Sequence, residues 1–122
     1  MGLTIRYHGS VEKDKNNVPK GAMGDKILEK YNEFINNLEE VSSFDEMRKR
    51  CQDLHPCGGG GGPGTMSYSE KLNGKWRVVV RYRQADNLVV VMGVTDHDYD
   101  GVARRQVAMD AYREAQKMFP GL

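Results

Sequence analysis

The residues of this chain that could do chemistry gather in its last third. Arg77 enters one run of branched and aromatic residues, and His97 and Tyr99 follow a second such run. Side chains of these kinds favour strands, so the sequence predicts an antiparallel strand pair with a polar, ionisable cluster at its end. An arginine, a histidine and a tyrosine held close together are what cleavage of RNA without a metal ion requires.

The bulk composition limits the kind of protein that carries this cluster. A chain of 122 residues suits one domain with one modest core. Its formal net charge is +1, so any affinity for nucleic acid must come from a local basic face. No apolar run approaches the roughly 18 residues that span a bilayer, and the N-terminus lacks a signal layout. We therefore expect a cytoplasmic protein without a membrane partner, whose Cys51 and Cys57 stay reduced.

Two helices are expected in the first half of the chain. Ser43, followed three residues later by Glu46, forms a capping box that starts a helix over residues 44–54. A longer helix over residues 25–40 precedes it, because apolar residues recur there at helical spacing: Ile27, Leu28, Tyr31, Phe34, Ile35 and Leu38. The two helices predict a helical hairpin.

Two segments of the chain predict flexible loops. Residues 9–23 are polar and lysine-rich, and they follow a short alternating strand over residues 3–8. Residues 57–64 contain a run of five glycines followed by Pro63-Gly64. Glycine loses much backbone entropy on ordering, so this second segment is expected to lack regular structure.

The second half of the chain predicts three antiparallel strands, over residues 65–72, 76–83 and 87–94. Asn73-Gly74 is a strong hairpin signal between the first two. The middle strand places Trp76, Val78, Val80 and Tyr82 on one face, and Arg77, Val79, Arg81 and Arg83 on the other. The last strand is apolar on both faces, as a central strand would be. With a closing helix over 101–119, the predicted fold class is α+β: one domain over 1–122, a small antiparallel meander sheet packed by the helical hairpin and a C-terminal helix.

The strand-pair segment resembles a known family. A tight turn leads into an aromatic-arginine-hydrophobic run from Asn73 to Tyr82, a hydrophobic strand runs from Asn87 to Val94, and an exit rich in histidine and tyrosine spans Asp96 to Tyr99. This pattern is similar to that of the RelE/HigB/YoeB family of bacterial toxin ribonucleases. In element order the resemblance covers residues 24–120.

The resemblance implies a RelE-like fold and a metal-independent endoribonuclease, which cleaves messenger RNA, commonly on the ribosome, by attack of a 2′-hydroxyl on the neighbouring phosphate. Arg77 would bind the scissile phosphate, and His97 and Tyr99 would transfer protons. Substrate contacts would come from Arg81, Lys71, Lys75 and Trp76. The implied partners are RNA, including ribosome-bound messenger RNA, and a cognate antitoxin protein; no cofactor or metal is implied.

Other interpretations of the same residues stay open. Asp96, Asp98 and Asp100, followed by Gly101, match the first half of a calcium loop, but Val107 stands where a bidentate glutamate belongs. A weak calcium-binding domain and a non-catalytic protein- or nucleic-acid-binding module on the same fold are therefore the alternatives. Trp76 is either a core residue or a surface on which a base stacks.

Overall fold

The structure is a computed structural model that describes residues 3–58, 65–73, 75–84 and 87–96. Within these ranges the elements run in the order β1 (Thr4–Tyr7), α1 (Ser10–Asn16), α2 (Ala22–Glu40), α3 (Phe44–Arg50), β2 (His55–Gly58), β3 (Thr65–Lys71), β4 (Arg77–Arg83) and β5 (Leu88–Thr95). The predicted helix over 101–119 and most of the glycine-rich segment lie outside the described residues. The elements form an α+β fold, as predicted.

The five strands form one sheet in the order β1-β5-β4-β3-β2. The predicted meander of β3, β4 and β5 is confirmed, because each of these strands pairs antiparallel with the next. The first strand pairs parallel with β5, with Thr4 opposite Leu88, so the complete sheet is mixed. Strand β5 lies between β1 and β4, and its residues up to Val94 are buried, which agrees with its prediction as a central strand.

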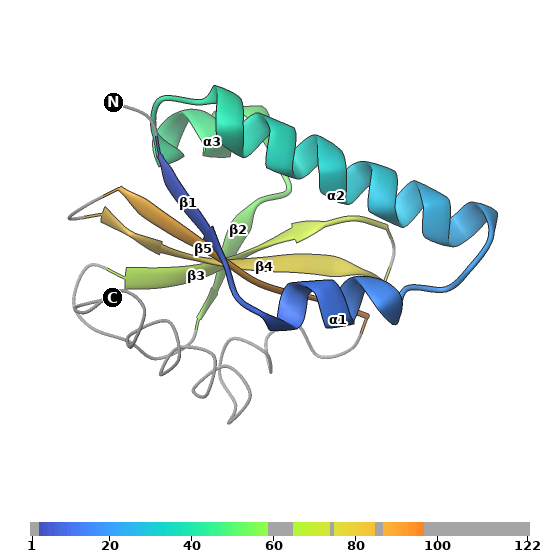
Figure 1. Cartoon of the computed structure of the whole chain (residues 1–122). Helices are drawn as coiled ribbons and strands as arrows, with labels where there is room; N and C mark the ends of the chain where they lie inside the picture. Colours follow the sequence, from blue (N-terminus) through green and yellow to red (C-terminus); the bar gives the residue numbers. More distant parts are fainter. Residues whose placement is uncertain (1–2, 59–64, 74, 85–86, 97–122) are drawn as a thin grey trace.

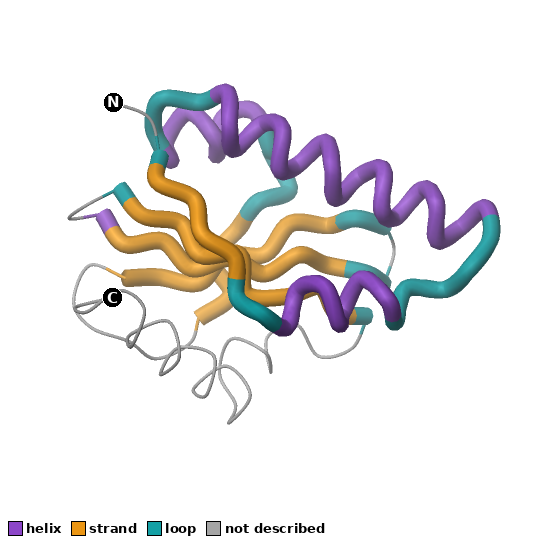
Figure 2. Tube along the Cα trace, in the orientation of Figure 1, coloured by secondary structure: helices purple, strands orange, loops and turns teal. Residues whose placement is uncertain are grey.

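Helices α2 and α3 lie along the same side of the sheet (Figures 1 and 2). Helix α2 buries the stripe expected from its spacing, with Ile27, Tyr31, Phe34 and Leu38 turned toward the core. Helix α3 is anchored by Phe44, whose ring stacks on Tyr82 of β4 at a centroid distance of 4.2 Å. The main core therefore lies between this helical pair and one face of the sheet.

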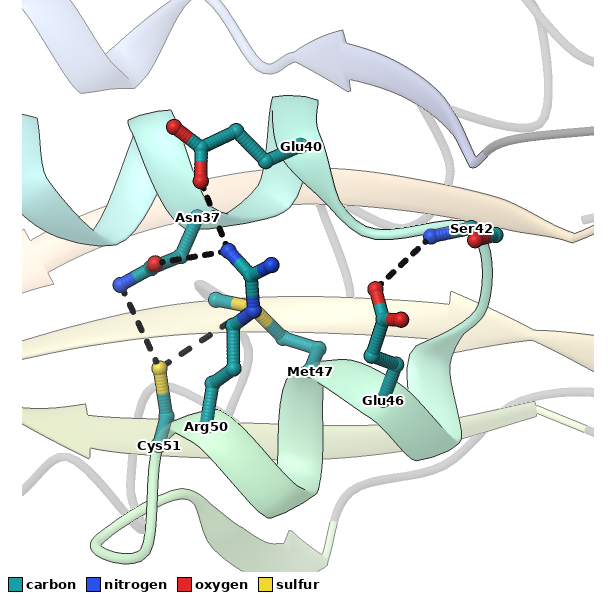
Figure 3. Close-up of polar contacts among 7 residues, drawn as sticks. All are labelled: Asn37, Glu40, Ser42, Glu46, Met47, Arg50 and Cys51. Carbon is teal, nitrogen blue, oxygen red and sulfur yellow. Dashed lines mark hydrogen bonds and ion pairs between the residues drawn. The ribbon is translucent and has the colours of Figure 1, made fainter.

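The start of α3 follows the predicted capping box, with one difference. The Ser43 hydroxyl accepts a hydrogen bond from the Glu46 amide at 3.2 Å. The Glu46 carboxylate accepts from the amide of Ser42, at 3.1 Å, and not from that of the N-cap itself (Figure 3). Arg50 at the other end of α3 donates to the Glu40 carboxylate at 2.7 Å. These contacts fix α3 against the end of α2.

The prediction of a flexible loop over residues 9–23 is wrong. Helix α1 occupies Ser10–Asn16, and α2 already begins at Ala22. Val11 and Val18 are buried in the main core, and the Asp14 carboxylate accepts a hydrogen bond from the Val94 amide of β5 at 3.0 Å. Tertiary contacts thus hold a short helix that the polar local sequence does not indicate.

The prediction for residues 51–58 also needs correction. Helix α3 ends at Arg50, earlier than the predicted residue 54, and the chain turns into strand β2. Cys57 and Gly58, which were assigned to a flexible loop, are part of this strand. Pro56 is tolerated because β2 is an edge strand that pairs on one side only, with β3.

Candidate functional site

The face of the sheet opposite α2 and α3, called here the second face, carries a row of polar residues. Residues that pair across neighbouring strands point to the same face, and residues two apart along a strand do so too. The register pairs His55 with Ser69, Ser67 with Arg81, and Lys71 with Arg77. These six residues, from β2, β3 and β4, form what we call the polar strip. Its three cations, Lys71, Arg77 and Arg81, were predicted to share a site.

Arg77 is held at the end of the polar strip by the hairpin that joins β3 to β4. Its Nη1 donates to the carbonyl oxygens of Asn73, at 2.7 Å, and Trp76, at 3.1 Å. The side chain is half-buried. A guanidinium anchored by backbone oxygens keeps its position before a ligand arrives, which lowers the entropy that binding an anion would cost.

The hairpin that anchors Arg77 is shaped by Asn73. Its side-chain oxygen accepts hydrogen bonds from the amides of Lys75, at 2.8 Å, and Trp76, at 2.7 Å. An asparagine that bonds the backbone two or three residues ahead stabilises a turn. Lys75 is exposed, as a substrate contact requires. Trp76 is 6% exposed and belongs to the main core, so the structure favours the core interpretation over stacking on a base.

Arg81 occupies a different environment from Arg77, although both lie on β4. It is 3% exposed, and its Nη1 donates to the Ser67 hydroxyl at 2.8 Å. Ser67 and Ser69 are fully buried. A buried cation needs hydrogen-bond partners, and the Ser67 hydroxyl is one partner of Arg81. This burial favours a positioning role for Arg81 over direct exposure to a substrate.

His55 is a member of the polar strip that the sequence did not indicate as a site residue. Its Nδ1 lies 2.7 Å from the carbonyl oxygen of Asp53, and its Nε2 lies 3.4 Å from the Ser69 hydroxyl. From the sequence, His55 stands beside a proline at the end of an expected helix. Only the pairing of β2 with β3 places it on the second face.

The remaining predicted residues lie at or beyond the end of β5. Asp96 follows β5 directly and is half-buried, while His97, Tyr99, Asp98 and Asp100 lie outside the described residues. Thr95, two residues before His97, is the register partner of Arg77. Strands β4 and β5 therefore bring Arg77 opposite the end of the strand that leads to the predicted proton-transfer residues.

The helix side of the sheet contains a cavity of about 590 Å³ between α2, α3 and the end of β3. Glu70 lines it, and burial, with repulsion from Asp53, raises the pKa of this carboxyl to about 7. Cys51 lies on the same wall, close to Asn37 and Arg50 (Figure 3). Burial, followed by the charge of Glu70, raises the pKa of its thiol to about 11. The thiol is therefore neutral near pH 7 and a poor nucleophile.

The described part of the chain contains no group of three or more His, Cys, Asp or Glu side chains placed to hold a metal ion. Cys51 and Cys57 are both buried, and the structure shows no disulfide between them. Among the helices that the structure describes, none has the length and apolar character needed to cross a membrane.

Comparison with solved structures places this arrangement among known folds. A chain in the crystal structure of the archaeal RelE–RelB complex from Pyrococcus horikoshii OT3 is similar, with a TM-score of 0.57 and 19% sequence identity over 81% of this chain and 99% of that chain. The chain has a RelE-like fold. The resemblance that the sequence carried is thus confirmed for the fold.

A second solved structure matches with a lower score. It is the RelBE2 toxin–antitoxin complex from Mycobacterium tuberculosis, with a TM-score of 0.38 and 18% identity over 80% of this chain and 100% of that chain. No protein-family model matches the chain, and no curated protein matches it. The RelE-like fold is therefore recognised through structure, at a sequence identity where direct sequence comparison finds nothing.

Proposed function

We propose that this protein is a toxin-type endoribonuclease that cleaves messenger RNA without a metal ion. The observation that carries the proposal is the anchored guanidinium of Arg77, at the end of a polar strip on a RelE-like fold. In the proposed reaction a 2′-hydroxyl attacks the neighbouring phosphate, and the leaving 5′-oxygen takes up a proton. Such a reaction needs a cation for the phosphate and two groups that transfer protons.

Arg77 is assigned to the scissile phosphate. The planar guanidinium can bind two phosphate oxygens at once, and its anchoring by Asn73 and Trp76 holds it in place. Lys71, its partner across the strands, is exposed and adds a second positive charge on the same face. Lys75 in the hairpin is assigned to the RNA backbone. These charges give the local basic face that a net charge of +1 requires.

His97 and Tyr99 are assigned to proton transfer, as the resemblance implies. The support from the structure is indirect: β5 ends at Thr95, opposite Arg77. The proposed partners are RNA, including messenger RNA on the ribosome, and an antitoxin protein. The similar Pyrococcus structure is a RelE–RelB complex, which supports the antitoxin proposal. The proposed location is the cytoplasm.

The test is induced expression in a bacterial host, with Arg77→Ala and His97→Ala beside the wild type. We expect growth arrest by the wild type, accompanied by cleavage of cellular messenger RNA, and relief of arrest by both substitutions. Arg83→Ala is the matched control, because Arg83 lies on the same strand and face at the far end from Arg77. It should arrest growth as the wild type does.

Soluble expression must be verified for every variant by size-exclusion chromatography. Unimpeded growth with abundant soluble wild-type protein, and no cleaved messenger RNA, would reject the toxin proposal. The RelE-like fold would then serve as a scaffold for a non-catalytic binding module. Equal relief by Arg77→Ala and Arg83→Ala would leave the toxin proposal standing but would remove the assignment of Arg77.

A further inference from the structure

The inference concerns the cavity of about 590 Å³ on the helix side of the sheet. Its walls come from α2, from α3 and the turn that follows it, and from the end of β3. A volume of this size lies within the range of small-ligand sites, roughly 300–1,000 Å³. The proposed ribonuclease assigns no role to the acidic residues of this cavity.

The basic residues of the cavity wall already have partners or point elsewhere. Arg50 donates from Nη1 to the Glu40 carboxylate at 2.7 Å (Figure 3). Lys30 pairs with Glu33, on the next turn of α2, at 3.7 Å. The register of β3 turns Lys71 to the second face of the sheet. The positive charges of the wall are therefore not hydrogen-bonded to the carboxyl described next.

Glu70 is a carboxyl of the wall that lacks a hydrogen-bond donor. It pairs with Val78 of the main core, so its side chain points to the helix side. Its Oε2 is buried, and within the described part of the chain no group donates a hydrogen bond to it. Asp53, a second carboxyl on this wall, precedes His55 by two residues, and the pairing of His55 with Ser69 brings it to the same end of β3.

A cationic donor in the cavity would compensate both carboxyls. A buried acceptor without a donor costs free energy, and burial, followed by the charge of Asp53, raises the pKa of Glu70 to about 7. Glu70 as a whole is half-buried. The last torsion of a glutamate has a broad energy minimum, so its rotation can turn either carboxyl oxygen toward a donor in the cavity.

The cavity wall also has an apolar part. Phe34 and Leu72 line it, and they are only 3% and 5% exposed. Acidic acceptors beside an apolar surface fit a cation that is carried on an alkyl chain. A planar guanidinium donates two parallel hydrogen bonds to a carboxylate, and it is more weakly hydrated than an ammonium ion. It therefore enters a half-buried site at a lower desolvation cost.

We propose that this cavity binds a guanidinium group carried on an alkyl chain, with the carboxylates of Glu70 and Asp53 as its acceptors. The alkyl chain lies against Phe34 and Leu72. A free alkylguanidine and an arginine side chain of a partner protein share this chemistry. The inference goes beyond the proposed ribonuclease and does not rest on it, because neither carboxylate acts in that reaction.

Isothermal titration calorimetry of the full chain at pH 8 and low salt tests the proposal. The probes are butylguanidinium, an acetylated and amidated tripeptide with arginine between two glycines, and the same peptide with citrulline in place of arginine. We expect millimolar Kd values for the two cations and binding weaker by about tenfold or more for citrulline, which keeps the shape without the charge. Tighter binding of the arginine peptide would indicate a partner protein as the source, and tighter binding of butylguanidinium a free ligand.

Variants of the wall locate the binding. Glu70→Gln keeps the size of the side chain without its charge, and it should raise the Kd of both cations by about tenfold or more. Asp53→Asn should raise it less. Glu33→Gln is the matched control, because Glu33 lines the same cavity but is largely exposed and pairs with Lys30; its Kd should stay within about twofold of the wild type.

Nuclear magnetic resonance shows whether the cations bind in this cavity. The backbone amide signals of residues 51–53 and 70–72 should shift on titration, and those of α1 should not. Circular dichroism verifies the folding of each variant. Absence of binding at millimolar concentrations, equal binding of the citrulline peptide, or an unchanged Kd in folded Glu70→Gln would each overturn the proposal. None of these results depends on whether the protein cleaves RNA.

Discussion

The two faces of the sheet are both buried, but among the described residues the buried polar side chains all lie on the second face. On the helix side, Trp76, Val78 and Val80 of β4 pack into the main core beneath α2 and α3. On the second face the same strands bury Ser67 and Ser69 completely and leave Arg81 only 3% exposed. The difference arises because successive side chains of a strand point to opposite faces of the sheet. One strand can therefore place apolar residues on the helix side and polar residues on the second face.

The two faces should therefore contribute differently to the stability of the fold. Apolar burial on the helix side is the dominant favourable contribution to folding. The buried cation Arg81, bonded to the Ser67 hydroxyl, contributes less to stability than apolar residues of the same volume would, because its desolvation offsets its hydrogen bonds. Stability alone therefore does not explain the buried polar residues of the strip. Substitutions on the two faces should accordingly give different results.

The largest expected effect is on the helix side. Phe34→Ala removes a ring that is 3% exposed in the core beneath α2, and it should lower the free energy of unfolding by about 3–5 kcal/mol. Urea denaturation measures this change. The control is Met23→Ala on the same helix, where the side chain is 63% exposed and a change within about 0.5 kcal/mol is expected. A loss below about 1 kcal/mol for Phe34→Ala would show that α2 does not form this core.

An intermediate effect on the free energy of unfolding is expected for Ser67 and Arg81, the hydrogen-bonded pair buried on the second face. Ser67→Ala removes the acceptor at 2.8 Å from Arg81 and should lower the free energy of unfolding by about 1–3 kcal/mol, because the buried Nη1 of Arg81 loses this hydrogen bond. Arg81→Met should also destabilise the protein. The double variant should regain much of the summed loss, since replacing both partners by apolar groups removes the unpaired group.

A double-mutant cycle by urea denaturation measures the coupling between Ser67 and Arg81. The same cycle with Ser69→Ala is the matched control, because Ser69 is equally buried but its hydroxyl contacts His55. Strict additivity for Ser67 and Arg81 would mean that their hydrogen bond does not contribute to stability.

The sequence predicted those parts of the fold that depend on local periodicity. The alternation over residues 76–83 correctly separated the core face from the face that carries Arg77 and Arg81, and the apolar spacing located α2. Helix α1 could not be predicted in this way, because it is held by Val11 in the core and by the bond from Val94 to Asp14, eighty residues apart in the chain. The parallel pairing of β1 with β5 is likewise non-local.

The same distinction applies to the candidate site. Arg77 and Lys71 were indicated by their residue types and strand positions, and the register places them side by side. His55 was missed because its strand, His55–Gly58, has four residues and contains a proline, so it shows no readable alternation. The raised pKa of Glu70 depends on α2, α3 and Asp53 closing around it, and no local pattern encodes that.

The smallest expected effect on the free energy of unfolding concerns Glu70, a half-buried carboxyl on the otherwise apolar helix side of the sheet. Its pKa is raised to about 7 in the folded protein from an ordinary value of 4.5. The carboxyl is neutral in both states below about pH 4.5, and its contribution to stability is lost as the pH rises through about 7, where the folded protein must hold a half-buried charge. Glu70→Gln cannot ionise, so it should be more stable than the wild type at pH 8 and equal to it at pH 4.

Solvent screening of a half-buried group reduces the expected gain at pH 8 to about 1 kcal/mol. Urea denaturation of both proteins at pH 4, 6 and 8 measures it. Glu33→Gln is the control, because Glu33 lines the same cavity but is largely exposed and pairs with Lys30 at 3.7 Å; it should change little at any pH. An equal response of the two variants would mean that water reaches Glu70 as freely as Glu33.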